Sequence, residues 1–129
     1  MTTIERELHI EASPEIVYEV LTSPEHLVKW WPDEAKVSLA PGEPGTIAFL
    51  PDYPSVPLTV DEAIPVSRFA FTWAEDLQVT FTLTPSGTGT LVRFVESGHA
   101  DAAGHAENVR GWDHFLPRLV EYVPTTVAA

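Results

Sequence analysis

The 129-residue chain contains no cysteine, which excludes disulfide bonds, thiolate metal ligands and cysteine-based catalysis. Basic residues are also scarce, with 7 Lys and Arg against 19 Asp and Glu and a formal net charge of -12 at pH 7. Such a chain is repelled by nucleic-acid phosphates and by anionic lipid surfaces, so we expect neither nucleic acid nor a membrane as a partner. A ligand would approach through an acidic exterior, which favours a neutral or cationic apolar molecule over a fatty-acid anion.

Long apolar runs are absent as well. Residues 1–10, MTTIERELHI, alternate charged and apolar side chains and lack the continuous apolar segment of a signal peptide. The longest apolar stretches span only a few residues, too few to cross a bilayer, so we expect a soluble cytoplasmic protein. No repeat and no Ser/Gly-rich linker divides the chain, which predicts a single domain over residues 1–129.

What the chain does contain is a clear order of periodic segments. Residues 4–11 alternate apolar and charged side chains, apart from Arg6, and predict a first strand. Ser-Pro-Glu occurs twice, at Ser13 and Ser23, and supplies an N-cap, a preset φ and an acid near the helix N-terminus. The predicted helices span residues 14–21 and 24–31. A period of two then predicts six strands, at residues 36–40, 45–50, 56–64, 67–74, 77–84 and 89–97.

After Gly98, apolar residues recur at spacings of three and four from Val109 to Val123 and predict a long C-terminal helix, with a kink at Pro117. The predicted fold class is therefore α+β, with seven antiparallel strands, two short helices and one long helix. A sheet with one dry face must be covered, and this helix is the available element. Because a helix is narrower than a curved sheet, a cavity is expected between them.

Three segments of the chain carry a resemblance to a known family. Residues 13–31 include Trp30-Trp31, residues 79–99 end in Glu96-Ser97-Gly98-His99, and residues 111–122 begin with Gly111-Trp112. In their order and spacing they resemble the homologues of the activator of heat-shock protein 90 ATPase, a branch of the START-like (SRPBCC, birch-pollen-allergen-like) superfamily. The resemblance implies a helix-grip fold and a stress-response context.

The sequence also departs from the pattern of that family. The family commonly carries an aromatic residue after Glu-Ser-Gly, where this chain has His99, and its last helix usually lacks a proline such as Pro117. The founding co-chaperones carry a separate N-terminal domain that engages the chaperone, and its absence here weighs against chaperone activation. The fold alone does not define a function, because helix-grip domains bind ligands, catalyse cyclisations or bind partners.

Large apolar side chains are the first candidates for a ligand site, although each of them can equally be core packing. Glu96 shares the parity of Val92 and Phe94, which makes it a candidate inward-pointing acid or base; the favoured alternative pairs it with Arg93, Arg110 or backbone amides. The residues predicted to surround the cavity are Trp30, Trp31, Phe49, Phe69, Phe71, Trp73, Phe81, Phe94, Glu96, Trp112 and Leu116.

Metal-capable side chains are densest at His99, Asp101, His105 and Glu107. Their spacing matches no known metal site, so a solvated loop followed by a capped helix start is favoured, and we expect neither a metal nor another cofactor. Arg6 is either an inward charge or an edge residue whose stem lies on apolar surface.

No catalytic set of residues is defined by the sequence, which favours non-catalytic binding of a small hydrophobic or aromatic molecule. One alternative is an enzyme resembling polyketide cyclases and aromatases, in which Glu96, Arg6 or His99 moves protons. The other is a chaperone cofactor or protein-interaction module. A homodimer is compatible with each of these functions.

Overall fold

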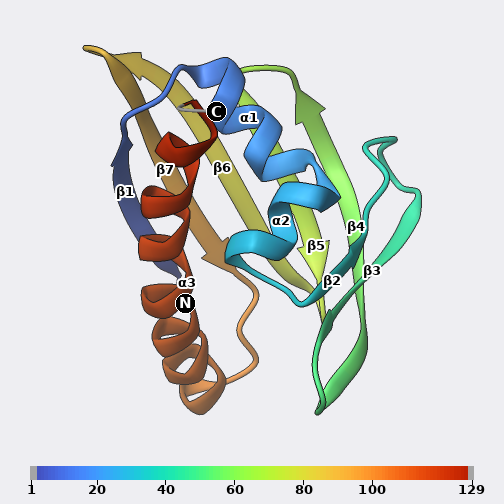
Figure 1. The fold of residues 1–129 in the computed structure, drawn as a ribbon. Helices are drawn as coiled ribbons and strands as arrows, with labels where there is room; N and C mark the ends of the chain where they lie inside the picture. The colour runs from blue at the N-terminus through green and yellow to red at the C-terminus, as the bar shows by residue number, and fades with distance from the viewer. Residues whose placement is uncertain (1–2, 128–129) are drawn as a thin grey trace.

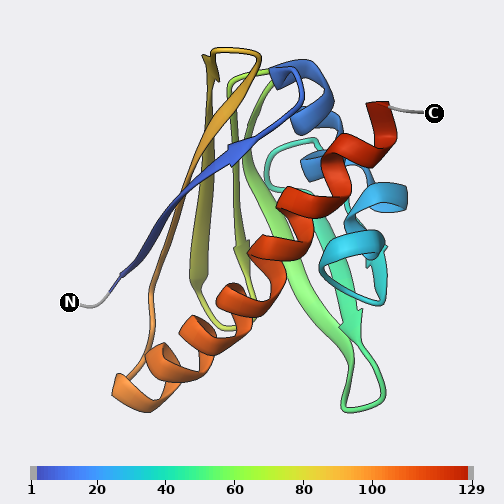
Figure 2. The same ribbon diagram turned by 60° about the vertical axis from the view of Figure 1, so that its left-hand side comes forward.

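The computed structural model of the protein describes residues 3–127. One antiparallel sheet and three helices make up the fold, with the helices on one face of the sheet (Figure 1). The long helix crosses that face diagonally, as Figure 2 shows. The elements in chain order are β1 (Ile4–Ile10), α1 (Pro14–Thr22), α2 (Pro24–Trp30), β2 (Glu34–Lys36), β3 (Pro44–Phe49), β4 (Tyr53–Ile64), β5 (Arg68–Trp73), β6 (Leu77–Ser86), β7 (Gly89–Ser97) and α3 (Ala102–Val127).

The seven strands follow the order β1-β7-β6-β5-β4-β3-β2, so β1 and β2 are the two edges of the sheet. The predicted α+β helix-grip architecture is confirmed, as is the hairpin of β6 and β7, whose register runs from Gln78 opposite Ser97 to Ser86 opposite Gly89. Within residues 3–127, no helix combines the length and the hydropathy that crossing a membrane requires.

The helix starts follow the predicted Ser-Pro-Glu pattern only in part. The hydroxyl of Ser13 accepts a hydrogen bond from the backbone N–H of Ile16 at the start of α1. Ser23 precedes α2 but makes no side-chain capping bond there, which corrects the prediction. Ser23 is also the last cap of α1, and its N–H is bonded to the carbonyl of Glu19. Ser23 is therefore the junction between the two helices, and it makes a capping hydrogen bond through its backbone N–H but not through its side chain.

The prediction of a strand at residues 36–40 is wrong. The strand is Glu34–Lys36, and it pairs with β3 from Glu34 opposite Ala48 to Lys36 opposite Thr46. Pairing with β3 starts before residue 36, because the N–H of Asp33 already donates to the carbonyl of Ala48 at 2.8 Å.

The long helix α3 begins at Ala102, before the apolar pattern that predicted it, and stays helical through Pro117 and Pro124. The kink at Pro117 stays a prediction.

The core lies between the inner face of the sheet and the three helices. Its strand residues alternate as predicted, and its helix residues recur at spacings of three and four. The buried apolar core is centred on Ile4, Ile10, Val17, Val20, Leu21, Leu27, Trp30, Trp31, Ile47, Leu58, Val60, Phe69, Phe71, Val79, Phe81, Leu83, Val92, Phe94, Trp112, Leu116, Leu119 and Val123.

Candidate functional site

Glu96 is a charged residue in the middle of this core. It lies near the end of β7, opposite Ile4 of β1 and Val79 of β6, and it has the inward parity of Phe94. Its exposed fraction is 0%. Burying a carboxylate is costly unless hydrogen bonds replace the lost water, so the donors around Glu96 decide what it can do.

Four side chains bring a nitrogen within hydrogen-bond distance of the Glu96 carboxylate. Trp73 Nε1 and Trp112 Nε1 each donate to Oε2 at 2.9 Å. Asn108 Nδ2 donates to Oε1 at 2.8 Å, and His99 Nε2 lies 2.9 Å from the same atom. A carboxylate has about four acceptor positions, so these contacts occupy its capacity. We call these five residues the Glu96 cluster.

Backbone geometry after β7 brings His99 into the Glu96 cluster. Gly98 has φ +96°, and a Cβ atom placed on it would lie 2.3 Å from the backbone oxygen of Asp76. Only glycine fits this conformation and this close approach. The chain therefore turns against the β5–β6 connection, and the His99 side chain, 1% exposed, reaches back to Glu96.

Two expectations about this region are corrected by the geometry. Glu96 was expected to pair with Arg93, Arg110 or backbone amides, but Arg93 bonds to Glu5 on the other face of the sheet. His99 was expected in a solvated loop, but its side chain is buried. The capped helix start is present, since Asp101 Oδ1 accepts a bond from the N–H of Gly104 at 2.7 Å. Local sequence signals identified the helix start and missed the inward turn.

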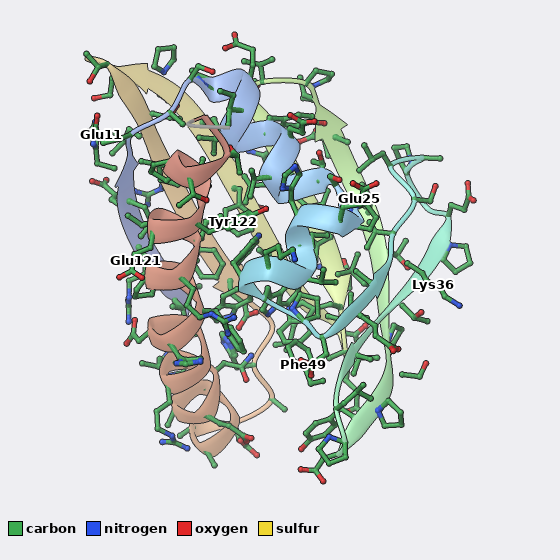
Figure 3. All side chains as sticks on the ribbon, in the orientation of Figure 1. Glu11, Glu25, Lys36, Phe49, Glu121 and Tyr122 are labelled. Carbon is green, nitrogen blue, oxygen red and sulfur yellow. The ribbon has the colours of Figure 1, made fainter. Side chains whose placement is uncertain are left out.

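A cavity of about 410 Å³ lies on the other side of the two indoles, between α3 and the strands β3, β4 and β5. Its walls are mainly aromatic, and its polar residues include Glu107 and Asn108 of α3. Figure 3 shows Phe49 below α2, in the region between α3 and β3. The mouth is reached by solvent, because Tyr53 is 60% exposed. The aromatic residues that line it are Trp31, Phe49, Tyr53, Trp73, Trp112 and Phe115.

Trp31 is the centre of this aromatic wall. Its ring centroid lies 5.1 Å from that of Trp73, at an interplanar angle of 77°, and 5.1 Å from that of Trp112. Phe49 packs on the same ring with centroids 5.9 Å apart. Edge-to-face and tilted contacts of this kind hold aromatic rings in fixed orientations. The wall is thus preformed by ring packing and by the indole bonds to Glu96.

The structure divides the predicted cavity residues into two groups. Trp31, Phe49, Trp73 and Trp112 line the cavity, and Glu96 lies behind the last two. The other six are at most 2% exposed and pack in the core without lining the cavity: Trp30, Phe69, Phe71, Phe81, Phe94 and Leu116.

The predicted cavity set lacked several residues that line the cavity, among them Tyr53, Asn108 and Gly111. Tyr53 begins β4 opposite Phe49, in a segment between the strands predicted at residues 45–50 and 56–64. Asn108 precedes Trp112 by one helical turn, a spacing that places both side chains on the same face of α3. That spacing is the signal that would have found Asn108.

Arg6 lies away from the cavity. Its Nε donates to Asp113 Oδ1 at 3.0 Å, and its Nη2 donates to Oδ2 at 3.3 Å, which links β1 to α3. The hydrogen bond to Asp113 raises the pKa of the guanidinium group, and partial burial opposes that effect. Arg6 is therefore an edge residue in an ion pair.

The part of the chain that the structure describes contains no arranged metal site. Within residues 3–127, no group of three or more His, Asp or Glu side chains is placed to hold a metal ion. His99 and His105 do contact each other, with ring centroids 5.0 Å apart, but His105 Nε2 points to the backbone oxygen of Thr3 at 3.2 Å.

Fold and site together define a helix-grip domain with an aromatic cavity beneath its last helix. Residues 11–124 match the sequence model of the family described as Activator of Hsp90 ATPase homolog 1-like protein, and the chain belongs to this family. The resemblance seen in the sequence is thereby confirmed. No curated protein sequence matches the chain.

Several solved structures share this fold over almost their whole length. Protein MLL2253 from Mesorhizobium loti is 26% identical, with a TM-score of 0.87 and coverage of 97% of this chain and 98% of that chain. Protein BH1534 from Bacillus halodurans is 25% identical, with a TM-score of 0.81 and coverage of 95% and 97%. The Aha1 protein from Colwellia psychrerythraea, solved as a dimer, is 26% identical, with a TM-score of 0.78 and coverage of 95% and 96%.

Proposed function

We propose that this protein binds a small apolar or aromatic molecule in the cavity between α3 and strands β3–β5. The volume of about 410 Å³ lies within the range of small-molecule pockets, roughly 300–1,000 Å³. Aromatic walls with a few polar groups are also typical of such pockets. The rings are held in place before any ligand arrives, which lowers the entropic cost of binding.

Gly111 is the observation that carries this proposal. It lies inside α3 and lines the cavity, and a Cβ atom placed on it would meet nothing within 4 Å. Glycine in a helix interior costs about 1 kcal/mol relative to alanine. The chain therefore keeps a bare helix surface towards the cavity where a larger residue would fit, and a ligand is the occupant that makes use of this space.

The same geometry favours binding over proton transfer. Glu96, Arg6 and His99 are the residues invoked for cyclase chemistry, and none of them lines the cavity. Both oxygens of Glu96 accept bonds from protein groups, so a bound molecule would contact indole rings instead of the carboxylate. Glu96 is thus a positioning residue for the wall.

The proposal is tested with N-phenyl-1-naphthylamine, a neutral apolar dye whose fluorescence rises in an apolar site. Saturable binding to the full chain is expected, and Gly111→Leu should abolish it by filling the cavity. Ala106→Leu adds the same side chain at an exposed position of α3 and should leave binding unchanged. Equal binding by both variants would contradict the proposal, provided that circular dichroism shows both to be folded.

We also propose that the protein forms a homodimer. The Aha1 protein, which is 26% identical and was solved as a dimer, favours this assembly. In this chain, β1 and β2 leave two sheet edges unpaired within the described residues. Light scattering after size-exclusion chromatography would measure a mass near twice 14.2 kDa for a dimer. A mass near 14.2 kDa at all concentrations would exclude it.

A further inference from the structure

The charges around the aromatic cavity have one sign. Among the described residues that line it, Glu107 is the charged one, and it is exposed. No lysine, arginine or histidine is in this lining set. An anionic ligand would thus meet a carboxylate and find no basic side chain in the walls, whereas a cation would find a partner.

The aromatic walls add a second attraction for positive charge. Indole has the most electron-rich face among the aromatic side chains, and a cation within about 6 Å of its centroid is attracted by the ring quadrupole. Three indoles belong to the cavity lining: Trp73 is half-buried and presents its ring to the cavity, whereas Trp31 and Trp112 are buried beside it. Phe49 and Phe115 extend the same surface, with centroids 6.0 Å apart.

Glu96 strengthens this effect from behind the wall. One oxygen, Oε2, accepts the N–H groups of both Trp73 and Trp112 at 2.9 Å. A carboxylate on an indole N–H pushes electron density into the ring, which makes its face more negative. The basic neighbour of Glu96, His99, contacts the other oxygen, Oε1. The buried position of Glu96 also limits the screening of its charge by water.

We propose that the cavity recognises an organic cation, an alkyl- or aryl-substituted ammonium group, with the indole of Trp73 and the rings of Phe49 and Phe115 as its contact surface. This inference rests on the proposed binding function and names the chemical class of the ligand. The net charge of -12 acts in the same direction, because it concentrates cations near the mouth of the cavity.

The test compares three molecules of similar shape as competitors of N-phenyl-1-naphthylamine: benzyltrimethylammonium, its neutral isostere neopentylbenzene, and the anion 2,2-dimethyl-3-phenylpropanoate. The cation is expected to bind about tenfold more tightly than the neutral isostere, and the anion more weakly than both. Equal binding of cation and isostere would overturn the inference and leave the proposed function standing. Failure of the dye itself to bind would instead overturn the proposed function.

Two controls separate the aromatic contact from the general acidity of the protein. At about 0.5 M NaCl the Debye length falls to roughly 4 Å, which screens the surface charges but leaves contact within the cavity. The preference for the cation should persist there, and its disappearance would assign it to the surface. Glu96→Gln should lower cation affinity several-fold while binding of the neutral isostere changes less. An equal loss for both molecules would limit Glu96 to a structural role and contradict its part in cation recognition.

Discussion

Trp73 and Trp112 donate their indole N–H groups to the same carboxylate oxygen, Glu96 Oε2, each over 2.9 Å. Trp73 comes from β5 and Trp112 from α3, so one buried acceptor joins the sheet to the helix that covers it. Their ring centroids are 6.0 Å apart at 76°, and both residues belong to the cavity lining. Stability and the shape of the candidate site therefore depend on one carboxylate.

Replacement of Glu96 by Leu should lower the free energy of unfolding by about 3–5 kcal/mol, because buried donors would lose their acceptor. Glu96→Gln should cost less, about 2–3 kcal/mol, since the amide keeps one acceptor oxygen but turns N–H groups towards other donors. Urea denaturation monitored by circular dichroism measures both values. A loss below about 1 kcal/mol for Glu96→Leu would show that the donors are satisfied in another way.

Two buried tryptophans provide a matched comparison. Trp112 and Trp30 are 2% and 1% exposed, but Trp30 Nε1 is the buried side-chain polar atom without a partner among the described residues. Trp112→Phe should cost about 1–2 kcal/mol more than Trp30→Phe, because it removes a hydrogen bond to a buried carboxylate, whereas Trp30→Phe removes an unsatisfied donor. Urea denaturation of both variants decides this, and a larger loss for Trp30→Phe would refute the argument.

Gly98 and Gly87 both have positive φ, at +96° and +59°, but differ in their surroundings. Gly98→Ala should destabilise by about 2 kcal/mol or more, because its Cβ would lie 2.3 Å from the Asp76 oxygen. Gly87→Ala should cost about 1 kcal/mol, since a Cβ there meets nothing within 4 Å. Thermal unfolding of the two variants compares them. Similar midpoints would mean that the contact with Asp76 relaxes freely.

The ion pair of Arg6 and Asp113 should contribute little, although its geometry is bidentate. Its side chains are 37% and 51% exposed, and exposed pairs contribute about 0.2–1 kcal/mol. A double-mutant cycle of Arg6→Ala and Asp113→Ala should give a coupling free energy in that range, falling further in high salt. A coupling above about 2 kcal/mol would contradict the view of Arg6 as a solvent-screened edge residue.

Sequence patterns predicted those elements whose signals are local. The hairpin of β6 and β7 was predicted because Val79, Phe81 and Leu83 alternate and a glycine-containing turn follows. β2 was misplaced because its position is set by pairing with β3, which no local pattern in residues 34–40 records.

The Glu96 cluster shows the same limit for the site. Its donors come from β5, from the turn after β7 and from two positions of α3, so their convergence depends on tertiary packing. Parity alone indicated that Glu96 could point inward. Only the Asn108 and Trp112 pair leaves a helical spacing in the sequence, and it identifies neither the shared acceptor nor the cavity.

Gly111→Ala should separate stability from binding. A methyl group at this position meets nothing within 4 Å, so the gain in helix propensity should raise the free energy of unfolding by about 0.5–1 kcal/mol. The same methyl group enters the cavity and should weaken binding of N-phenyl-1-naphthylamine. Gly104→Ala is the control in the same helix: its Cβ would lie 3.3 Å from Asp101 Oδ1, outside the cavity lining, so dye binding should not change. Urea denaturation and dye titration of both variants test this pairing. A Gly111→Ala protein that is less stable than the parent would show that the open space at this position is not available to a side chain.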